Sequence, residues 1–224
     1  MEEGLIGKIH RELPELLKKN AALIESKRPK TERNRSGYLL YDALTDGVYD
    51  LSKVICGSEG TLGVVTQAVL KVVPLPGRVG LAAIYFESIL DAAKIVPLIR
   101  QTNPVTCELM DEQVMALGKK AAPHLAHLLP DGARAMLIVE YEGLDEAEVT
   151  PQLSALEEKL KGAAFQSLRI VTEPKDQADI WATRSAATPL LFLRGDKLQP
   201  VPVVEDAAVP PEKLAPYLEK CGKI

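Results

Sequence analysis

Residues 54–66 read VICGSEGTLGVVT, and this glycine-rich stretch decides how we interpret the fold. Gly57, Gly60 and Gly63 are spaced by three, so the backbone can turn tightly and approach a flat ligand closely. The residues that follow, 64–73, are rich in β-branched side chains, which favour a strand. We therefore predict a tight turn over the three glycines that leads directly into a strand.

This glycine pattern differs from the two common nucleotide-binding motifs. The dinucleotide fingerprint has another glycine spacing and opens a helix, whereas we predict a strand after Gly63. A Walker loop needs a Lys-Ser or Lys-Thr pair after its last glycine, and none follows here. From the residues alone, a purely structural turn and a turn that contacts a ligand are equally good interpretations.

The region before the turn is predicted to be helical and then irregular. From Glu2 to Ser26 apolar residues recur at mostly helical intervals, which indicates one broken helix or two short ones, with Pro14 able to begin the second. Residues 27–37 are basic and polar without periodicity. We expect a loop there that faces a ligand or a partner.

A domain boundary is predicted just after the strand. Pro74-Leu75-Pro76-Gly77 cannot continue a ladder of backbone hydrogen bonds. We therefore expect a first domain over residues 1–76 and a second over residues 77–224.

The second domain is predicted to alternate strands and helices, which is typical of an α+β fold with helices on one face of a sheet. The strand order does not follow from this pattern. The expected strands are 80–86, 105–110, 135–141, 165–171 and 202–206, and the expected helices are 90–101, 111–120, 145–161, 175–187 and 211–219.

Composition excludes several classes of function. The chain of 224 residues has 27 basic and 31 acidic residues, a net charge of -4, and no basic stripe for a phosphate backbone, so nucleic acid is not an expected partner. Its longest apolar runs, such as 81–86, are far shorter than the roughly 20 residues of a transmembrane helix. The acidic N-terminus and the three widely spaced cysteines predict a reduced, cytoplasmic setting.

Residues 33–38 (RNRSGY), Leu51 and residues 54–66 together resemble a known family. They are similar to the second half of the PCMH-type FAD-binding domain of the vanillyl-alcohol-oxidase superfamily, in its D-lactate dehydrogenase, glycolate oxidase and D-2-hydroxyglutarate dehydrogenase branch. The resemblance implies that FAD is the cofactor and that Val64 holds its adenine end through the backbone. It also implies that Asn34, Gly37, Gly57, Ser58, Gly60 and Gly63 lie along the flavin.

The second half of the chain resembles the substrate-cap domain of the same family, which has a ferredoxin-like α+β fold. The similar segments are 107–111, 180–184 and 203–210. The resemblance implies that Arg184 binds the carboxylate of the substrate, and a guanidinium offers the planar donors for this contact. The alternative is a surface or salt-bridged arginine. For Trp181 we favour core packing over a pocket wall.

The remaining candidate residues are given structural roles. Glu205 and Asp206 precede Pro210-Pro211 and are expected to form a cap or turn. His124 and His127 have no acidic or cysteine partner at metal spacing, so no metal site is predicted. We expect Cys56 to be a small buried residue rather than a flavin contact.

Two motifs of the family have no counterpart in this sequence: an upstream glycine-rich pyrophosphate loop, and a downstream histidine-rich segment that supplies metal ligands or the general base. We therefore expect part of a longer enzyme that is inactive by itself. In that enzyme a base outside this chain takes the hydroxyl proton, and a hydride passes from a D-2-hydroxy acid to flavin N5. No catalytic residue is assigned here.

Residues 194–200 are similar to family members with a fused iron–sulfur region, which would then accept the electrons. Two alternatives stay open. The chain could be a non-catalytic α+β module for ligand binding or dimerisation, which predicts no dependence on flavin. It could also belong to a flavin oxidase of a non-carboxylate alcohol, because the glycine turn is shared across the superfamily.

Overall fold

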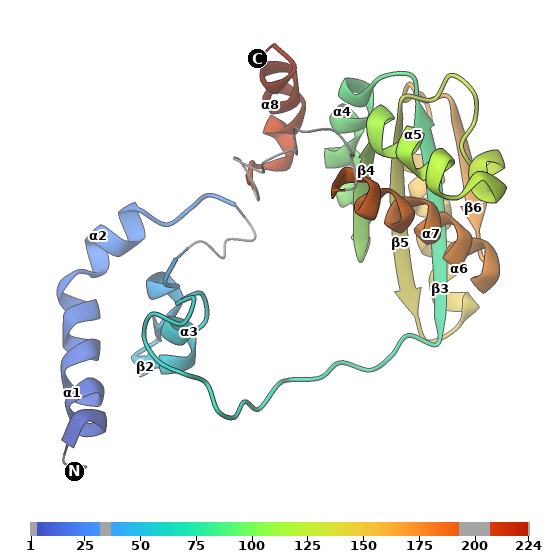
Figure 1. Ribbon diagram of the computed structural model, residues 1–224. Helices are drawn as coiled ribbons and strands as arrows, with labels where there is room; N and C mark the ends of the chain where they lie inside the picture. The colour runs from blue at the N-terminus through green and yellow to red at the C-terminus, as the bar shows by residue number, and fades with distance from the viewer. Residues whose placement is uncertain (1–3, 32–36, 193–206, 224) are drawn as a thin grey trace. The chain divides into compact units, whose positions relative to one another are not determined.

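A computed structural model describes residues 4–31, 37–192 and 207–223 of the chain (Figure 1). The chain divides into two compact units, Met1–Val72 and Val73–Ile224. The expected strand at 202–206 and the segment 194–200 lie outside the described residues, as do Asn34, Glu205 and Asp206.

The first unit has a small core at which its short elements meet. Helix α1 (Gly4–Lys19) and helix α2 (Ala21–Ser26) confirm that this region is helical with one break, as the alternatives of one broken helix or two short ones both predicted. A short 3-10 helix η1 (Leu40–Asp42), the hairpin β1 (Leu44–Thr45) and β2 (Val48–Tyr49), and helix α3 (Leu51–Ile55) follow. Leu17, Ala43 and Val54 are buried together in this core.

The break between the first two helices falls at Asn20, so the prediction that Pro14 begins the second helix is wrong. Pro14 lies inside α1. Asn20 leaves helical geometry at φ -106° and ψ 10°. Its side-chain amide donates to the Leu16 carbonyl at 2.8 Å, and such a local bond competes with the helical ladder.

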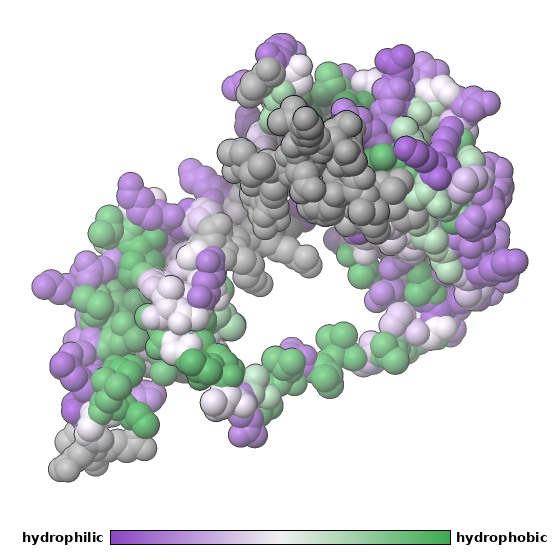
Figure 2. Space-filling model, viewed as in Figure 1, coloured by the Kyte–Doolittle hydropathy of each residue, from purple (hydrophilic) through white to green (hydrophobic). Residues whose placement is uncertain are grey.

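The predicted strand at 64–73 does not form among the described residues, where this segment is irregular. A strand needs a neighbouring strand to satisfy its backbone groups, and no other described segment pairs with this one. Its apolar side chains are consequently exposed, with 91% of Val64 and 95% of Val69 accessible (Figure 2).

The second unit is built on a four-stranded antiparallel sheet in the order β4-β5-β3-β6. Helix α4 connects β3 to β4 across β5, and helix α6 connects β5 to β6 across β3, which is the ferredoxin-like arrangement. The strands are β3 (Arg78–Phe86), β4 (Thr106–Asp111), β5 (Ala135–Gly143) and β6 (Ser167–Val171). The α+β fold class is confirmed.

Helices cover both faces of this sheet, so the prediction of helices on one face is wrong (Figure 1). Alternate residues of β3 point to opposite faces: Ala82 and Ile84 pack toward α4 and α6, while Leu81 and Ala83 pack toward the other layer. Burial on both faces explains why β3 is a continuous apolar run. One layer is α4 (Ile89–Arg100) and α6 (Glu146–Lys159), and the other is α5 (Glu112–Ala121), the 3-10 helix η2 (Pro123–Leu128) and α7 (Pro174–Phe192).

Side-chain caps begin three of these helices close to the predicted positions. The side-chain oxygens of Ser88, Asp111 and Asp145 accept hydrogen bonds from backbone N–H groups in the first turns of α4, α5 and α6. The expected helix at 211–219 is a 3-10 turn η3 (Pro211–Lys213) continued by α8 (Leu214–Cys221).

Candidate functional site

The predicted glycine turn follows α3 directly and has the backbone geometry that glycine permits. Gly57 and Gly60 have φ of 84° and 76°, in the left-handed region, and Glu59 between them has φ 50°. The Ser58 amide donates to the Ile55 carbonyl at 3.0 Å, and the Thr61 amide donates to the Ser58 carbonyl at 2.9 Å. The turn is thus a hydrogen-bonded extension of α3.

The start of α3 is fixed by Asp50. Its carboxylate accepts bonds from the Ser52 hydroxyl and from the Ser52 amide at 2.9 Å. These hydrogen bonds favour the ionised form and lower the pKa of Asp50. Desolvation, followed by the charge of Asp50, raises the pKa of the adjacent Tyr49.

Two segments that were predicted to contact the same cofactor lie side by side in the first unit. The Tyr38 hydroxyl is 2.8 Å from Thr61 Oγ1, across 23 residues of sequence. The Thr61 hydroxyl in turn donates to the Ser58 carbonyl at 2.7 Å. Gly37, with φ 68°, therefore lies next in sequence to a residue that holds the turn.

The turn is open to a ligand on its glycine side. A Cβ atom added at Gly37, Gly60 or Gly63 would meet no atom within 4 Å in the described structure. The amides of Gly60, Gly63 and Val64 donate no hydrogen bond to the described residues. Free amides on an accessible turn can meet the polar edge of a flat ligand, so these residues fit a flavin nucleotide.

The two residues that flank Gly57 differ in exposure: Ser58 is buried, whereas Cys56 is exposed. Only 5% of the Ser58 surface is accessible. Cys56 is exposed, and the expectation of a buried cysteine is wrong. It comes after the last residue of α3, beyond the part of the helix that packs on the core through Val54.

Arg184 lies on α7 in the second unit and is tied to the sheet beneath it. Its Nε donates to Glu108 Oε2 on β4 at 2.8 Å. Its side chain is 45% exposed and that of Glu108 is 37% exposed. Among the described residues Arg184 is therefore a salt-bridged arginine that still reaches solvent.

Trp181, one helical turn earlier, makes the equivalent contact with the next strand. Its indole Nε1 donates to Glu140 Oε2 on β5 at 2.9 Å, while its ring packs partly against the core. In the β4–β5 register Thr106 lies opposite Glu140 and Glu108 lies opposite Ile138. The two carboxylates are thus diagonal neighbours on the sheet face that α7 covers.

The position of α7 is set by close packing and by a buried amide. A Cβ added to Gly118 of α5 would lie 2.8 Å from the Thr183 carbonyl, so only glycine allows the two helices to approach this closely. Gln177 donates from Nε2 to the carbonyls of Val79 and Val171. These contacts fix the helix segment that presents Arg184.

The roles of Glu108 and Glu140 were missed in the sequence. Glu108 lies within a segment that resembled the family, yet 76 residues separate it from Arg184 and nothing local links them. The i, i+3 spacing of Trp181 and Arg184 indicates only that the two side chains share one helical face, and the sequence has no signal for their acceptors.

The two histidines that were considered for metal binding lie in η2. His127 Nδ1 is 3.0 Å from the His124 carbonyl, so this ring nitrogen has a backbone partner. Across the ranges that the structure describes, no three His, Cys, Asp or Glu side chains are grouped so as to hold a metal ion. In the same ranges no helix is long and apolar enough to span a bilayer.

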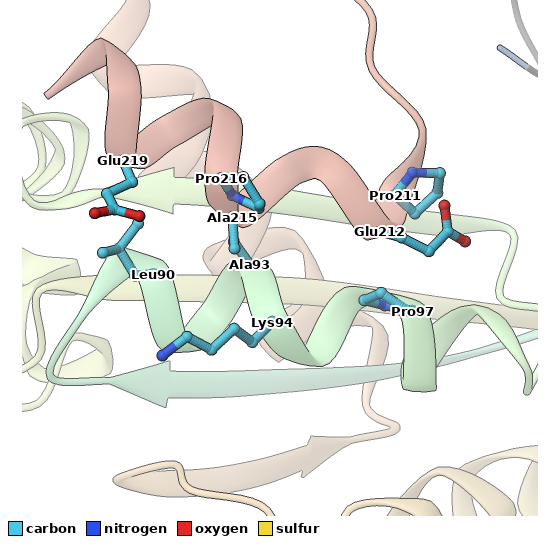
Figure 3. Close-up of a pocket in the computed structure, with 9 residues that line it drawn as sticks. All are labelled: Leu90, Ala93, Lys94, Pro97, Pro211, Glu212, Ala215, Pro216 and Glu219. Carbon is cyan, nitrogen blue, oxygen red and sulfur yellow. The ribbon is translucent and has the colours of Figure 1, made fainter. Parts of the chain in front are cut away.

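A separate groove lies between α4 and the η3–α8 segment (Figure 3). Its volume is about 410 Å³. None of the predicted substrate or cofactor residues lines it. The lining residues are Leu90, Ala93, Lys94, Pro97, Pro211, Glu212, Ala215, Pro216 and Glu219.

Comparison with known proteins gives matches over most of the chain. Residues 75–224 match the family model described as FAD linked oxidases, C-terminal domain. Over 96% of its length the chain is 31% identical to a D-2-hydroxyglutarate dehydrogenase of Pseudomonas putida. It is 33% identical over 79% of its length to the glycolate oxidase subunit GlcD of Bacillus subtilis, and 29% identical over 78% to a D-lactate dehydrogenase of Anaerostipes hadrus.

These relatives are longer than the chain. It spans 22% of the Pseudomonas protein, 36% of the Bacillus protein and 37% of the Anaerostipes protein. The matches confirm the resemblance to flavin-linked dehydrogenases and oxidases that the sequence predicted.

Proposed function

This chain belongs to the family of FAD linked oxidases, C-terminal domain, and on that premise we propose that it works in an FAD-dependent oxidoreductase that oxidises a D-2-hydroxy acid. FAD is the cofactor of this family. The similar proteins named above are a D-2-hydroxyglutarate dehydrogenase, a D-lactate dehydrogenase and a glycolate oxidase subunit. All three names refer to a 2-hydroxy carboxylate, and this supports a substrate of that class.

The single observation that carries the proposal is the state of Arg184. It is half exposed, and its Nε is taken by Glu108. A guanidinium has five N–H donors in one plane, so the terminal nitrogens remain for a second carboxylate. In the proposed function they bind the substrate carboxylate and orient the carbon that bears the hydroxyl group.

The glycine turn is proposed to hold the cofactor. Bound FAD would supply the acceptor for the hydride of the substrate. The free amides of Gly60, Gly63 and Val64 would donate to its polar edges, and Gly37 and Gly57 would allow the backbone to come close. Ser58 would support the turn from its buried side.

Substitution of Arg184 tests the substrate assignment. In the FAD-loaded protein that carries this chain, Arg184→Ala should lower kcat/KM for D-2-hydroxyglutarate and D-lactate by about 10- to 100-fold, because charged hydrogen bonds to the carboxylate are lost. Oxidation of uncharged alcohols should not fall. The matched control is Arg169→Ala, since Arg169 is 42% exposed and paired with Asp176 at 3.2 Å.

Three outcomes contradict the proposal. Unchanged kinetics in Arg184→Ala would remove the carboxylate-binding role of Arg184, and an unsubstituted protein that oxidises neither D-2-hydroxyglutarate nor D-lactate would remove the hydroxy-acid assignment. Purified protein that is colourless and cannot be reconstituted with FAD would remove the flavin assignment as well. Failure to oxidise hydroxy acids would favour the flavin oxidase of a non-carboxylate alcohol, and failure to bind FAD would favour the non-catalytic module.

A further inference from the structure

The hydrogen bond between Arg184 and Glu108 is made at Nε and restricts the orientation of the guanidinium. Glu108 Oε2 accepts from Nε, on the inner side of the guanidinium, at 2.8 Å. Because Nε and the two terminal nitrogens share one plane, a bond at Nε fixes how that plane is rotated. One terminal nitrogen lies beside Nε on the edge that faces Glu108, and the edge formed by the two terminal nitrogens remains for a second carboxylate.

Stability alone is a poor explanation for this ion pair. Both side chains are more than one third exposed, and pairs at that exposure contribute little to folding. An arginine side chain has many rotamers, however, and a bound ligand must restrict them. An ion pair that restricts them beforehand lowers the cost of ligand binding.

We propose that Glu108 is a positioning residue, which holds the Arg184 guanidinium in the orientation that receives the carboxylate of the substrate. This inference rests on the proposed function of Arg184. Glu108 touches neither substrate nor cofactor in this role and acts through the arginine. Its place on β4, an edge strand that pairs with β5 along its whole length, makes it a firm support for a side chain that extends from a helix.

Glu140 provides an internal comparison for this role. It lies on the same face of the sheet, diagonal to Glu108, and it also accepts a bond from α7. Its partner is the Trp181 indole rather than the guanidinium. Removing either carboxylate loosens one contact between α7 and the sheet, but only the loss of Glu108 frees Arg184.

Kinetics of three variants test the proposal in the FAD-loaded protein that carries this chain, with D-2-hydroxyglutarate and D-lactate as substrates. Glu108→Ala should raise KM by about three- to tenfold, as expected for freeing one long side chain, with kcat changed less. Glu108→Gln keeps an oxygen that can accept from Nε, so its KM should stay close to that of the unsubstituted protein. Glu140→Ala should leave KM unchanged.

Three outcomes would overturn the inference. The first is an unchanged KM in Glu108→Ala. The second is an equal rise in KM in Glu140→Ala, which would indicate a general loosening of α7. The third is a KM in Glu108→Gln as high as in Glu108→Ala, which would indicate that the charge matters rather than the hydrogen bond.

A double variant separates this inference from the proposed function. If Glu108 acts through Arg184, then Glu108→Ala combined with Arg184→Ala should be no worse than Arg184→Ala alone, because coupled residues are not additive. Additive losses would contradict the inference. If Arg184→Ala by itself leaves the kinetics unchanged, the proposed role of Arg184 fails. If Arg184→Ala has its expected effect and the Glu108 variants have none, the role of Arg184 stands and only the positioning role of Glu108 fails.

Discussion

The side-chain amide of Gln177 donates a hydrogen bond to the carbonyl of Val79 at 2.8 Å, and this bond joins α7 to β3 across 98 residues of sequence. The same nitrogen also donates to the Val171 carbonyl on β6 at 3.0 Å. Gln177 is buried, with 8% of its surface accessible. A single polar side chain therefore ties the helix of Arg184 to two strands.

Replacing this amide should destabilise the second unit. Gln177→Ala leaves two backbone carbonyls without this donor, and we expect the free energy of unfolding to fall by about 1–3 kcal/mol. Urea denaturation followed by circular dichroism measures the change. Gln113→Ala, at an exposed position of α5, is the control and should have little effect. Equal stability of the two variants would contradict the structural role of Gln177.

Tyr85 should make the stability of the chain depend on alkaline pH. Its hydroxyl donates to the Leu128 carbonyl at 2.6 Å, and burial raises its pKa to about 12 although the charge of Arg169 opposes this. Because the unfolded pKa is near 10, the stabilising contribution is complete below pH 10 and is lost as the pH rises toward 12. Between pH 9 and 11 the loss amounts to about 1 kcal/mol.

Urea denaturation at both pH values measures this loss, and Tyr85→Phe is the matched variant. It should be less stable at neutral pH, because the hydrogen bond is gone, and its stability should decrease less between pH 9 and 11. Burial also raises the pKa values of Tyr141 and Cys107, so the free energy of unfolding of Tyr85→Phe should still decrease somewhat between pH 9 and 11. If the free energy of unfolding of Tyr85→Phe decreases with pH as much as that of the unsubstituted chain, the Tyr85 hydroxyl does not titrate as expected.

The three cysteines should differ in reactivity. Cys56 and Cys221 are exposed, whereas burial raises the pKa of Cys107 to about 11 against the opposing charge of Arg100. At pH 8 a thiol of this kind carries almost no thiolate, which is the reactive form. We expect a disulfide reagent such as DTNB to modify two thiols rapidly and the third only in urea. In Cys107→Ala, the addition of urea should make no further thiol reactive toward DTNB. Rapid reaction of all three thiols in the unsubstituted chain would contradict the burial of Cys107.

The hydroxyl of Tyr38 should strengthen cofactor binding by holding the glycine turn. Tyr38→Phe removes the bond to Thr61, and the dissociation constant for FAD should rise by about two- to tenfold, the value of one ordinary hydrogen bond. Quenching of FAD fluorescence on binding to the apoprotein that carries this chain measures it. The control is Tyr49→Phe, because the buried Tyr49 hydroxyl has no hydrogen-bond partner among the described residues. Similar affinities for the two variants would argue against a role of Tyr38 in holding the turn.

Local features of the sequence were sufficient to predict most elements of the second unit. The apolar run at 80–86 and the capping residue Asp145 are examples, because strand propensity and helix capping act within a few residues. The turn at Gly57 and Gly60 was predicted for the same reason. Their positive φ angles are a property of glycine itself.

Such local patterns could not predict which distant segments contact one another. The pattern of β3 suits a sheet covered on both faces, but which helices cover each face depends on how α4 and α6 cross over the sheet. The segment 64–73 has the composition of a strand and remains unpaired in the described structure, because a strand is defined by its neighbours.

By itself, the sequence determined the α+β class, the elements that local propensity and caps specify, and the family that its glycine turn resembles. Only the tertiary structure decided that Arg184 faces Glu108 and that Tyr38 meets Thr61. The physical reason is that a side-chain hydrogen bond depends on distances of about 3 Å between atoms that the chain brings together from far apart. Those distances are set by the packing of whole helices and strands, and no local pattern encodes them.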